Sequence, residues 1–424
     1  MRILVIGSGG REHAICYSFA RSSRVEKIFC APGNAGVATV AECIPIKPED
    51  IDSLIEFAAR ESIDLTFVGG ETALALGIVD QFEKRGLKII GASMSAARLE
   101  ASKAFAKDFM ARHGVPTAKY VTADSPSKAI EILESGHFGD ELSAVVVKAD
   151  GLAAGKGVVV ARDRSEAIAA CGELVDLVGD AAEQIVLEEC LIGREVSLLM
   201  FVDGNNFALM PPVRDHKRIG EHDTGPNTGG MGTITDSGLL TPKQSQEIIE
   251  DMIEPTLAGC LADGFPFRGI LFLGLMLTDG GAKLLEYNVR FGDPETQSIL
   301  VRLETDLVDI CEAMLEGKLA EQKIEWSSGN SACVVLAAEG YPLKPRTGDL
   351  ISGLDDAASI DGVTIFHAGT AISSDGDLLT AGGRVLGVTA RGVSLEETLR
   401  VAYAAAERVS WSGMQYRRDI GKAH

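Results

Sequence analysis

The chain has 424 residues and a net charge of −21. At about 150 residues per domain, this length predicts about three domains. An apolar fraction of 46% and a charged fraction of 24% are typical of globular proteins. So acidic a surface disfavours nucleic acids and anionic membranes as partners. A phosphate-bearing substrate would therefore be held by local Lys, Arg and backbone N–H groups.

The eight cysteines contain no C-x-x-C pair. This spacing disfavours a zinc ribbon or a disulfide framework and favours reduced thiols in a cytoplasm. No apolar run approaches the ~20 residues that cross a bilayer. The first residues, Met1–Ile6, form a strand pattern without the long apolar stretch of a signal peptide. We therefore expect a cytoplasmic location and no membrane partner.

Residues 1–100 alternate strand and helix patterns. Short buried strands are predicted at Ile3–Ile6, Lys27–Ala31, Leu65–Val68 and Lys88–Ile90, with amphipathic helices at Ile51–Arg60 and Ala75–Lys84. This βαβ pattern predicts a parallel sheet covered on both faces. Ligands of such sheets bind at the carboxyl ends of the strands.

A helix pattern at Ala101–His113 ends before Gly114. A small α+β module follows, with strands at Ala144–Lys148, Val158–Ala161 and Gln184–Glu189 and a helix at Ser165–Val178. Longer strands are predicted at Val196–Val202, Ile270–Leu277 and Lys283–Val289, with helices at Pro242–Ala262 and Glu304–Glu316. Ser328–Asn330 marks a break, after which short strands and glycine turns lead to a final helix, Leu395–Val409.

Three glycine loops follow predicted strands of the first domain, at Gly7–Gly10, Gly33–Gly36 and Gly69–Gly70. Because they share one sheet edge, they could form a sugar-phosphate site in which Gly9 and Gly10 donate N–H groups, Asn34 hydrogen-bonds and Glu71 holds ribose hydroxyls. A dinucleotide fingerprint is the competing interpretation, and a turn needed only for packing is another. The fingerprint fails because Glu12 replaces the third glycine and the second strand ends without an acidic residue.

The segment Lys148–Val158 resembles a Walker A loop but is one residue short, has glycine where Ser or Thr would bind Mg²⁺, and precedes a strand. It predicts a glycine-rich flap that folds over a triphosphate, with Lys148 at a strand end facing phosphate oxygens. A flexible surface hairpin is the alternative. The next strand carries Glu188 and Glu189 and is followed by Cys190, Leu191 and the G-x-E of Glu195. Backbone groups near Leu191 suit an adenine edge, and Glu195 suits a ribose.

The strand Lys283–Val289 carries the strongest chemical signal. Alternation places Glu286, Asn288 and Arg290 on one face, and Leu285, Tyr287 and Val289 on the other. Charged and amide groups on such a face need partners. Glu286 and Asn288 suit Mg²⁺, a hard cation that binds oxygen ligands. Arg290 suits a carboxylate or a transferring phosphoryl group, and the turn after the strand should hold Asp293 nearby.

The loop Asp215–Gly232 contains four glycines and one proline within Gly225–Gly232. That composition denies it regular structure, so it is either disordered or closely wrapped around a ligand. We expect the ligand.

Taken together, the flap, the G-x-E at Glu195 and the E-x-N-x-R strand resemble ATP-grasp enzymes. Five ordered motifs narrow the resemblance to the phosphoribosylamine–glycine ligase family: G-x-G-G-R-E-H at Gly7–His13, P-G-N-A-G at Pro32–Gly36, K-A-D-G-L-A-A-G-K-G-V at Lys148–Val158, D-H-K-R with D-T-G-P-N-T-G-G-M-G at Asp215–Gly232, and R-F-G-D-P-E-T-Q at Arg290–Gln297. Two positions depart from the family pattern. Gly70 stands where Pro is usual, and Arg214 where many members have Gln.

The resemblance implies an α/β chain with four parts. These are an N-terminal parallel-sheet, Rossmann-like domain that binds phosphoribosylamine (residues 1–101), a central ATP-grasp domain (102–122 and 191–329), a flap subdomain (123–190) and a small C-terminal α+β domain (330–424). It implies ATP, Mg²⁺ or Mn²⁺, and the small molecules glycine and 5-phosphoribosylamine as ligands. We expect a monomer or weak homodimer.

The resemblance also assigns residues. ATP would be bound by Lys103, Lys148, Gly155, Lys156, Gly157, Glu188, Glu189, Leu191 and Glu195. Substrates would be bound by Gly9, Gly10, Gly33, Asn34, Glu71, Lys217, Gly229 and Gly230, and the metal by Glu286 and Asn288. The catalytic residues would be Arg290, Asp293, Asp215 and Lys148.

The implied reaction joins glycine to 5-phosphoribosylamine and releases ADP and phosphate. A carboxylate is a poor electrophile, so a glycyl phosphate is the expected intermediate. Arg290 would steady the glycine carboxylate and the transferring phosphoryl group, Asp215 would hold the ammonium group, and Asp293 would orient the acceptor or the metal. Another ATP-grasp ligase or carboxylase of purine synthesis is the alternative, and a catalytically inactive nucleotide-binding protein is a third.

Overall fold

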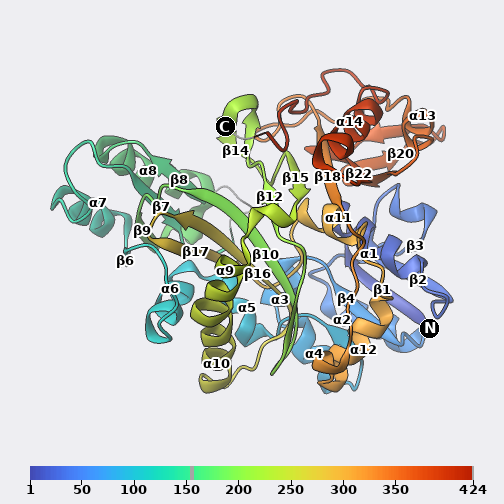
Figure 1. The fold of residues 1–424 in the computed structure, drawn as a ribbon, viewed down its shortest axis with the longest axis horizontal. Helices are drawn as coiled ribbons and strands as arrows, with labels where there is room; N and C mark the ends of the chain where they lie inside the picture. Colours follow the sequence, from blue (N-terminus) through green and yellow to red (C-terminus); the bar gives the residue numbers. More distant parts are fainter. Residues whose placement is uncertain (153–156, 423–424) are drawn as a thin grey trace.

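The computed structural model describes residues 1–152 and 157–422 (Figure 1). Its first hundred residues form a five-stranded parallel sheet in the order β3-β2-β1-β4-β5. The strands are β1 Arg2–Gly7, β2 Lys27–Pro32, β3 Glu42–Cys43, β4 Leu65–Val68 and β5 Ile89–Ile90. The predicted parallel sheet is confirmed.

Helices of this first unit are α1 Gly10–Ala20, α2 Ile51–Arg60, α3 Glu71–Ala75, α4 Ile78–Lys84 and α5 Met94–Ala101. The single helix predicted over Ala75–Lys84 is wrong. Two helices occupy Glu71–Lys84, and Gly77 separates them in the left-handed region with φ of +79°. Only glycine adopts that conformation freely, so the chain breaks there.

A four-stranded antiparallel sheet in the order β6-β9-β7-β8 forms the opposite end of the molecule, at the left of Figure 1. It contains β6 Tyr120–Ala123, β7 Val145–Ala149, β8 Val158–Ala161 and β9 Ile185–Glu189, with helices α7 Pro126–Glu134 and α8 Arg164–Val178. A separate hydrophobic core lies between the sheet and these helices. The predicted small α+β module is therefore present.

The largest sheet has nine strands and runs through both the central and the C-terminal regions. Its path is β17-β16-β10-β12-β15-β18-β22-β19, and β11 pairs with β10. The strands are β10 Arg194–Asp203, β11 Phe207–Leu209, β12 Val213–Asp215, β15 Gly232–Thr235, β16 Arg268–Thr278, β17 Gly281–Asn288, β18 Asn330–Ala337, β19 Val363–His367 and β22 Arg384–Gly392. The break predicted at residues 328–330 does not separate two sheets, because β18, which follows it, is hydrogen-bonded to β15.

The remaining elements pack around this sheet. They are α6 Lys103–Arg112, α9 Pro242–Ile248, α10 Glu254–Ala262, α11 Glu295–Leu300, α12 Leu307–Glu316, α13 Leu354–Ala358, α14 Leu395–Ala406, and the hairpins β13 Arg218–Gly220 with β14 Thr224–Asn227 and β20 Thr370–Ile372 with β21 Leu378–Thr380. A π-helical segment, η5 Ile249–Ile253, joins α9 to α10. No helix in the described ranges is long and apolar enough to cross a membrane.

Strand β17 contains an irregularity that the sequence pattern did not predict. Gly274 of β16 pairs with Glu286, but Leu275 pairs with Leu284, so Leu285 is an extra residue. Leu284, Tyr287 and Val289 are buried in the core, whereas Leu285 is only half-buried. The assignment of Leu285 to the core face was therefore wrong, because a bulge resets the alternation. Glu286 and Asn288 stay on the face opposite Tyr287.

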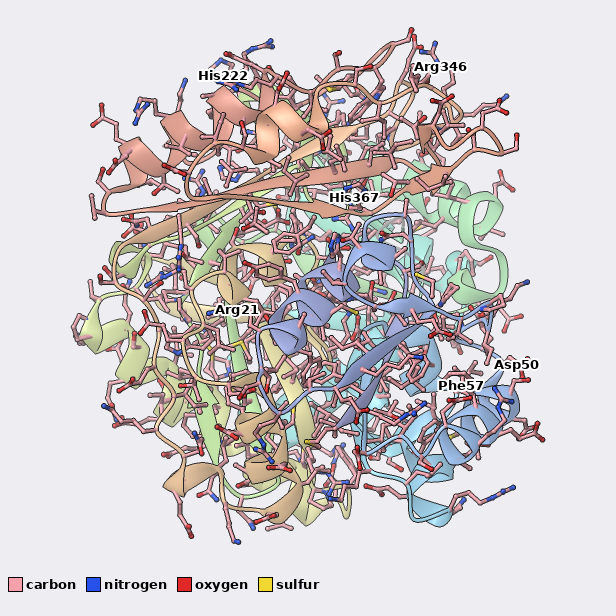
Figure 2. The ribbon with its side chains drawn as sticks, turned by 90° about the vertical axis from the view of Figure 1, so that its right-hand side faces the viewer. Arg21, Asp50, Phe57, His222, Arg346 and His367 are labelled. Atoms are coloured by element: carbon pink, nitrogen blue, oxygen red, sulfur yellow. The ribbon has the colours of Figure 1, made fainter. Side chains whose placement is uncertain are left out.

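The first sheet packs against the large sheet through a shared hydrophobic core. Leu4, Phe29 and Val68 share one hydrophobic cluster with Leu198 and Leu273 of the large sheet. Figure 2 shows the C-terminal strands above the N-terminal helices, with His367 at the boundary. There His13 Nδ1 accepts a hydrogen bond from the His367 backbone N–H at 2.8 Å. The N-terminal and C-terminal parts therefore meet through fixed, buried contacts.

Candidate active site

The carboxyl ends of β1, β2 and β4 lie at one edge of the first sheet, as predicted. A cavity of about 210 Å³ opens there. The loops after β1 and β4 line it, but Gly33 and Asn34 do not. The charged residues of its lining are Arg11, Glu12, Glu49, Glu71 and Asp293. Because carboxylates outnumber the one guanidinium, the cavity suits a group that donates hydrogen bonds.

Glu12 occupies the space that a dinucleotide phosphate would need. Its side chain is 1% exposed and lies against Gly7 and Gly69, where a Cβ atom would sit within 2.5 Å and 2.1 Å of it. Its Oε2 accepts the Gly9 N–H at 2.6 Å, and its Oε1 accepts Arg11 Nε at 2.6 Å. The Gly9 N–H, expected to donate to a phosphate, therefore donates to Glu12 in this structure.

Asn34 is also satisfied by the chain itself. Its Nδ2 donates to the carbonyls of Ser8 and His367, both at 2.8 Å, and its Oδ1 accepts from Gly36 and Val37. The side chain thus ties the loops after β1 and β2 to the end of β19. Gly33 lies beside it with φ of +73°, and its N–H donates to the Gly7 carbonyl. These contacts support a loop-holding role rather than direct substrate binding.

Arg290 connects the end of β17 to the first unit. Its Nη2 is 2.6 Å from Glu100 Oε1, and its Nε is 3.2 Å from Glu71 Oε2. Burial disfavours the charged form of Glu71, but Arg290 and Arg11 lower its pKa to about 2. Glu71 is therefore an ionised carboxylate at the cavity wall, already paired with guanidinium groups.

The predicted phosphate ligand Lys148 is almost fully buried at the end of β7. Its Nζ lies 2.6 Å from Glu188 Oε1 and 3.4 Å from the Leu285 carbonyl. The other carboxylate oxygen of Glu188 lies 2.8 Å from Lys107 Nζ. Burial lowers the pKa of Lys107 to about 8. Glu188, assigned above to ATP, is thus a buried counter-ion for two lysines.

Lys103 stands at the first turn of α6, next to the base of the flap. Its Nζ donates to the Gly151 carbonyl at 2.9 Å. Asp150 joins the same two elements, because its Oδ1 accepts the Ala104 N–H at 3.0 Å. Burial lowers the pKa of Lys103.

Glu286 of β17 lies near Lys103 and Lys148. Burial disfavours its charged form, but Lys217, Lys148 and Lys103 together lower its pKa below the usual value. The four cations around this one carboxylate (Lys103, Lys148, Lys217 and Arg290) make a site suited to several phosphate groups. Within the described ranges no cluster of three or more His, Cys, Asp or Glu residues could hold a metal alone. Glu286 and Asn288 fit a divalent ion whose remaining ligands are phosphate oxygens and water.

Asp215 and Glu295 form a carboxylate-rich corner at the end of β12. Asp215 Oδ1 is inaccessible to solvent and has no hydrogen-bond partner among the described residues. Burial and the nearby charge of Glu295 raise the pKa of Asp215 well above its usual value. Glu295 is 4% exposed, and burial raises its pKa as well. A small cation would relieve both groups.

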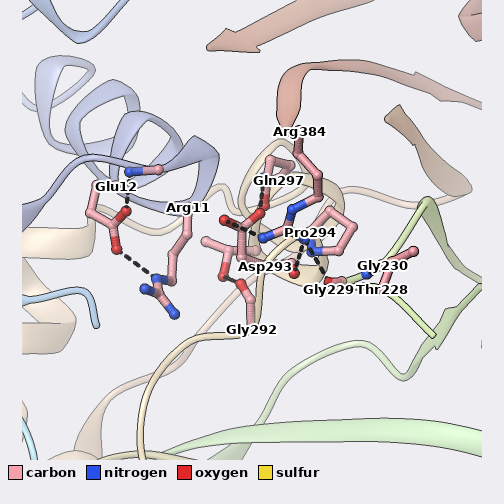
Figure 3. A network of polar contacts seen from close by, with 12 residues as sticks. Arg11, Glu12, Thr228, Gly229, Gly230, Gly292, Asp293, Pro294, Gln297 and Arg384 are labelled. Carbon is pink, nitrogen blue, oxygen red and sulfur yellow. Dashed lines mark hydrogen bonds and ion pairs between the residues drawn. The ribbon is translucent and has the colours of Figure 1, made fainter. Parts of the chain in front are cut away.

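Arg384 enters the site from β22 and contacts two predicted site segments (Figure 3). Its Nη1 donates to the carbonyls of Gly229 and Asp293, both at 2.6 Å, and its Nη2 is 3.1 Å from Asp293 Oδ2. Gln297 Nε2 donates to the other oxygen of Asp293 at 2.7 Å. Burial opposes ionisation of Asp293, but Arg384 and Arg11 lower its pKa.

Other assigned residues are more dispersed. Glu189 Oε1 accepts the Lys119 N–H at 2.8 Å, which gives that side chain a structural contact. Glu195 is exposed and lies 3.4 Å from Lys217 Nζ, and Leu191 is half-buried. Gly230 has φ of +112°, and a Cβ there would lie 2.7 Å from Asp215 Oδ1. Gly157 accepts the Ala149 N–H, Gly10 begins α1, and Gly155 and Lys156 lie outside the described residues.

Four residues of the site were not assigned from the sequence: Arg11, Glu12, Glu100 and Glu295. Arg11, Glu12 and Glu295 lie inside motifs that the sequence shows, so residue type and position could have suggested them. Glu100 gave no local signal. It reaches the site because α5 packs beside the end of β17, where Glu100 Oε2 accepts the Val289 N–H at 2.8 Å.

Three family models match the chain. The phosphoribosylglycinamide synthetase N domain matches residues 1–100, its ATP-grasp (A) domain matches 101–296 and its C domain matches 331–423. A phosphoribosylamine--glycine ligase of Xanthomonas axonopodis pv. citri is 48% identical over 99% of this chain and 97% of its own. One from Caldanaerobacter subterraneus subsp. tengcongensis is 44% identical over 100% of both chains.

Solved structures agree with these matches. The phosphoribosylamine--glycine ligase of Thermotoga maritima aligns with a TM-score of 0.84 and 36% identity, over 99% of this chain and 100% of the other. A biotin carboxylase of Campylobacter jejuni aligns with a TM-score of 0.72 and 16% identity, over 98% and 92%. An N5-carboxyaminoimidazole ribonucleotide synthetase in an ADP complex gives 0.66 and 18%, over 96% of both. The last two share the fold.

Proposed function

The chain belongs to the phosphoribosylglycinamide synthetase family, and from that premise we propose how its residues divide the work of the reaction. The reaction is the ATP-dependent ligation of glycine to phosphoribosylamine, a step of purine biosynthesis that forms ADP. The finer proposal is that a glycyl phosphate forms first, because a free carboxylate resists attack by an amine.

One observation carries the proposal: Lys103, Lys148, Lys217 and Arg290 are all near enough to Glu286 to favour its charged form and lower its pKa. Lys148, Lys217 and Arg290 also pair with other carboxylates, but together with Lys103 they bring four cationic groups with N–H donors to one place, where a triphosphate could bind. We propose that Glu286 and Asn288 hold the divalent ion, with Mg²⁺ preferred to Mn²⁺ as the harder and more abundant ion. When bound, that ion supplies charge neutralisation on the phosphate oxygens.

Lys148 and Lys103 would bind phosphate oxygens without moving far, since the chain already holds both ammonium groups in place. Arg290 has fewer N–H groups available to ligands than the sequence suggested. Three of its N–H groups engage Glu71, Glu100 and the Phe291 carbonyl. A guanidinium has five N–H groups, so we propose that the remaining two face the transferring phosphoryl group.

Glycine binding is assigned to the carboxylate-rich corner. Asp215 and Glu295 would share the ammonium group, because Asp215 Oδ1 is buried and no described residue hydrogen-bonds to it. This extends the predicted role of Asp215 to a second residue. Lys217 would balance the charge, since Glu195 raises the pKa of its ammonium group.

Phosphoribosylamine is assigned to the cavity at the edge of the first sheet. Glu71 and Asp293 are ionised there and would accept hydrogen bonds from ribose hydroxyls or the reacting amine. Asp293 would thus orient the acceptor rather than the metal. Gly10 and the Gly229–Gly230 turn do not line this cavity, and Gly33 and Asn34 hold the neighbouring loop.

We expect this reaction in the cytoplasm, because all eight cysteines are free thiols in the structure. The net charge of −21 keeps nucleic acid an unfavourable partner. We retain a monomer or weak homodimer as the expected state, to be measured by analytical ultracentrifugation.

The decisive experiment measures phosphate release from ATP with each substrate combination. We expect release only when glycine and freshly made phosphoribosylamine are both present. Release with bicarbonate and an aminoimidazole ribonucleotide, without glycine, would favour the carboxylase alternative instead. Trapping with hydroxylamine tests the intermediate, since glycyl phosphate would give glycine hydroxamate. Turnover without any hydroxamate would count against the acyl phosphate alone.

A further inference from the structure

The chain's last described segment, Arg417–Lys422, packs against the loop that carries Asp215 and Lys217. We call these the tail segment and the substrate loop, the latter covering residues 215–232. Strand β14 belongs to this loop. The inference below rests on the proposed function, because that proposal places glycine against the base of the substrate loop.

Arg417 is the centre of the contact. Its side chain is fully buried, and its Nε and Nη2 donate to the two carboxylate oxygens of Asp419, both at 2.8 Å. Its Nη1 reaches the substrate loop, donating to Asp223 Oδ1 at 2.7 Å and to the Arg218 carbonyl at 3.1 Å. One guanidinium therefore binds both the first strand and the turn of the β13–β14 hairpin.

The turn of that hairpin has an unfavourable backbone. His222 and Asp223 have φ of +57° and +53°, in the left-handed region that residues with side chains seldom adopt. The tail segment binds both residues: Asp419 Oδ2 accepts the His222 N–H at 2.8 Å, and Arg417 binds the Asp223 carboxylate. The tail contacts thus fall on the two positions where the loop most needs external support.

His216 links the tail segment to the base of the loop. Its Nδ1 lies 3.0 Å from the Gly232 carbonyl, which can only accept, so Nδ1 carries the proton. Its Nε2 then accepts the Gly421 N–H at 3.0 Å. The His216 ring is therefore neutral and is held by a hydrogen bond at each of its nitrogens. In the sequence, His216 lies between Asp215 and Lys217.

Two more contacts complete the arrangement. The Arg418 N–H donates to Glu221 Oε1 at 3.1 Å. Arg214 Nη1 donates to the Lys422 carbonyl at 3.1 Å. Arg214 is the position that departs from the family pattern. Ile420 packs in the same region, fully buried with Ile234 and Ala332.

From these contacts we propose that the tail segment is a positioning element of the active site. It sets the substrate loop so that Asp215 and Lys217 hold their places around glycine. The tail segment contacts the loop at its tip, through Arg417 and Asp419, and near its base, through His216 and Arg214. Its role concerns substrate geometry in addition to stability.

The test uses variants on the loop side, which keep the buried Arg417–Asp419 pair intact. Asp223→Ala removes the carboxylate that Arg417 binds, at a half-exposed side chain, and Arg214→Ala removes the contact with Lys422. We expect kcat/KM for glycine to fall by about tenfold in the double variant, with KM for ATP unchanged. Amide hydrogen exchange should accelerate in residues 218–231 and nowhere else.

Arg346→Ala is the matched control. This arginine also belongs to the C-terminal region and makes three contacts, with Glu339, Asp349 and the Ser412 carbonyl, but none with the substrate loop. It should leave glycine kinetics and loop exchange unchanged. Loop exchange and glycine kcat/KM equal to wild type in the double variant would overturn the proposal. Failure of the proposed function would look different, because the wild-type enzyme itself would then show no glycine-dependent phosphate release.

Discussion

Glu188 Oε1 lies 2.6 Å from Lys148 Nζ, on neighbouring strands of the four-stranded sheet. The same carboxylate binds Lys107, so three charges share one buried position. Two lysines and one glutamate leave a net positive charge, which a nucleotide phosphate can neutralise. The ion pair therefore both retains Lys148 inside the protein and leaves the position ready for an anion.

Replacing Glu188 with Gln should destabilise the protein. Two ammonium groups would lose their buried counter-ion, at a cost of roughly 3 kcal/mol in the free energy of unfolding. Urea denaturation measures this directly. Glu131→Gln is the control, because its pair with Lys128 is exposed and should leave unfolding unchanged. Equal midpoints for the two variants would show that the buried pair adds nothing to stability.

Replacing Glu286 with Gln or Ala should lower kcat by about a thousandfold, because the divalent ion loses its carboxylate ligand. Circular dichroism should show an unchanged fold. Glu250→Gln changes an exposed glutamate and serves as the control. Metal titration by calorimetry in the presence of ATP adds an independent readout. A Glu286→Ala enzyme that keeps most of its activity would refute the metal assignment.

Glycine use should depend on the charge of Asp215. Its pKa is raised by burial and by Glu295, so the group becomes protonated at a higher pH than an ordinary carboxylate. We expect kcat/KM for glycine to fall as pH decreases through this raised pKa. Removing the neighbouring charge with Glu295→Gln should lower the pKa of Asp215 and move the acid limb to lower pH. If the acid limb of the pH profile stays at the wild-type pH, Glu295 is not part of the glycine site.

Arg384 should be needed for the geometry of the site. Arg384→Lys cannot reproduce its three contacts with Asp293 and Gly229. We expect a loss of tenfold to about a hundredfold in kcat/KM for phosphoribosylamine, measured by steady-state kinetics. The fold should persist, as judged by thermal unfolding. If Arg384→Lys and Arg346→Lys lose equal activity, the effect belongs to the C-terminal region in general.

Three buried histidines should make the protein sensitive to acid. Burial lowers the pKa of His13 to about 3, and of His216 and His367 to about 4, from the usual 6.5. Between pH 6.5 and 4 the unfolded chain binds more protons than the folded chain, so the free energy of unfolding falls as pH decreases.

Denaturant unfolding at pH 7, 6 and 5 measures this slope. His13→Asn offers an oxygen to the His367 N–H in place of Nδ1 and should make the slope shallower. A variant with the wild-type slope would assign the acid sensitivity to other groups.

Much of the fold could be predicted from local patterns. The strands Leu65–Val68 and Val158–Ala161 and the helix Ile51–Arg60 match their predicted bounds, because short apolar runs and caps define them. The bulge at Leu285 and the pairing of β15 with β18 were not predictable in this way. Both depend on partners far away in the sequence, and local periodicity contains no information about them.

The residues of the site could be predicted from the sequence, but the contacts between them could not. The motifs placed Lys148, Glu286 and Arg290 correctly as residues of one region, since strand ends converge there. They did not reveal that Arg290 is shared by Glu71 and Glu100, or that the Asn34 side chain binds four backbone groups. Such partners come from elements brought together by packing, and a single sequence shows the residue without its neighbour.

The nine-stranded sheet spans the central and C-terminal regions, which has a practical consequence for producing these regions as separate fragments. A chain ended before Asn330 would leave the backbone N–H and C=O groups of β15 without the partners that β18 now provides. Open strand edges of this kind promote intermolecular pairing and aggregation. The matching C-terminal fragment would carry the complementary open edge. The two pieces should therefore precipitate when produced separately and regain solubility only when they are produced together.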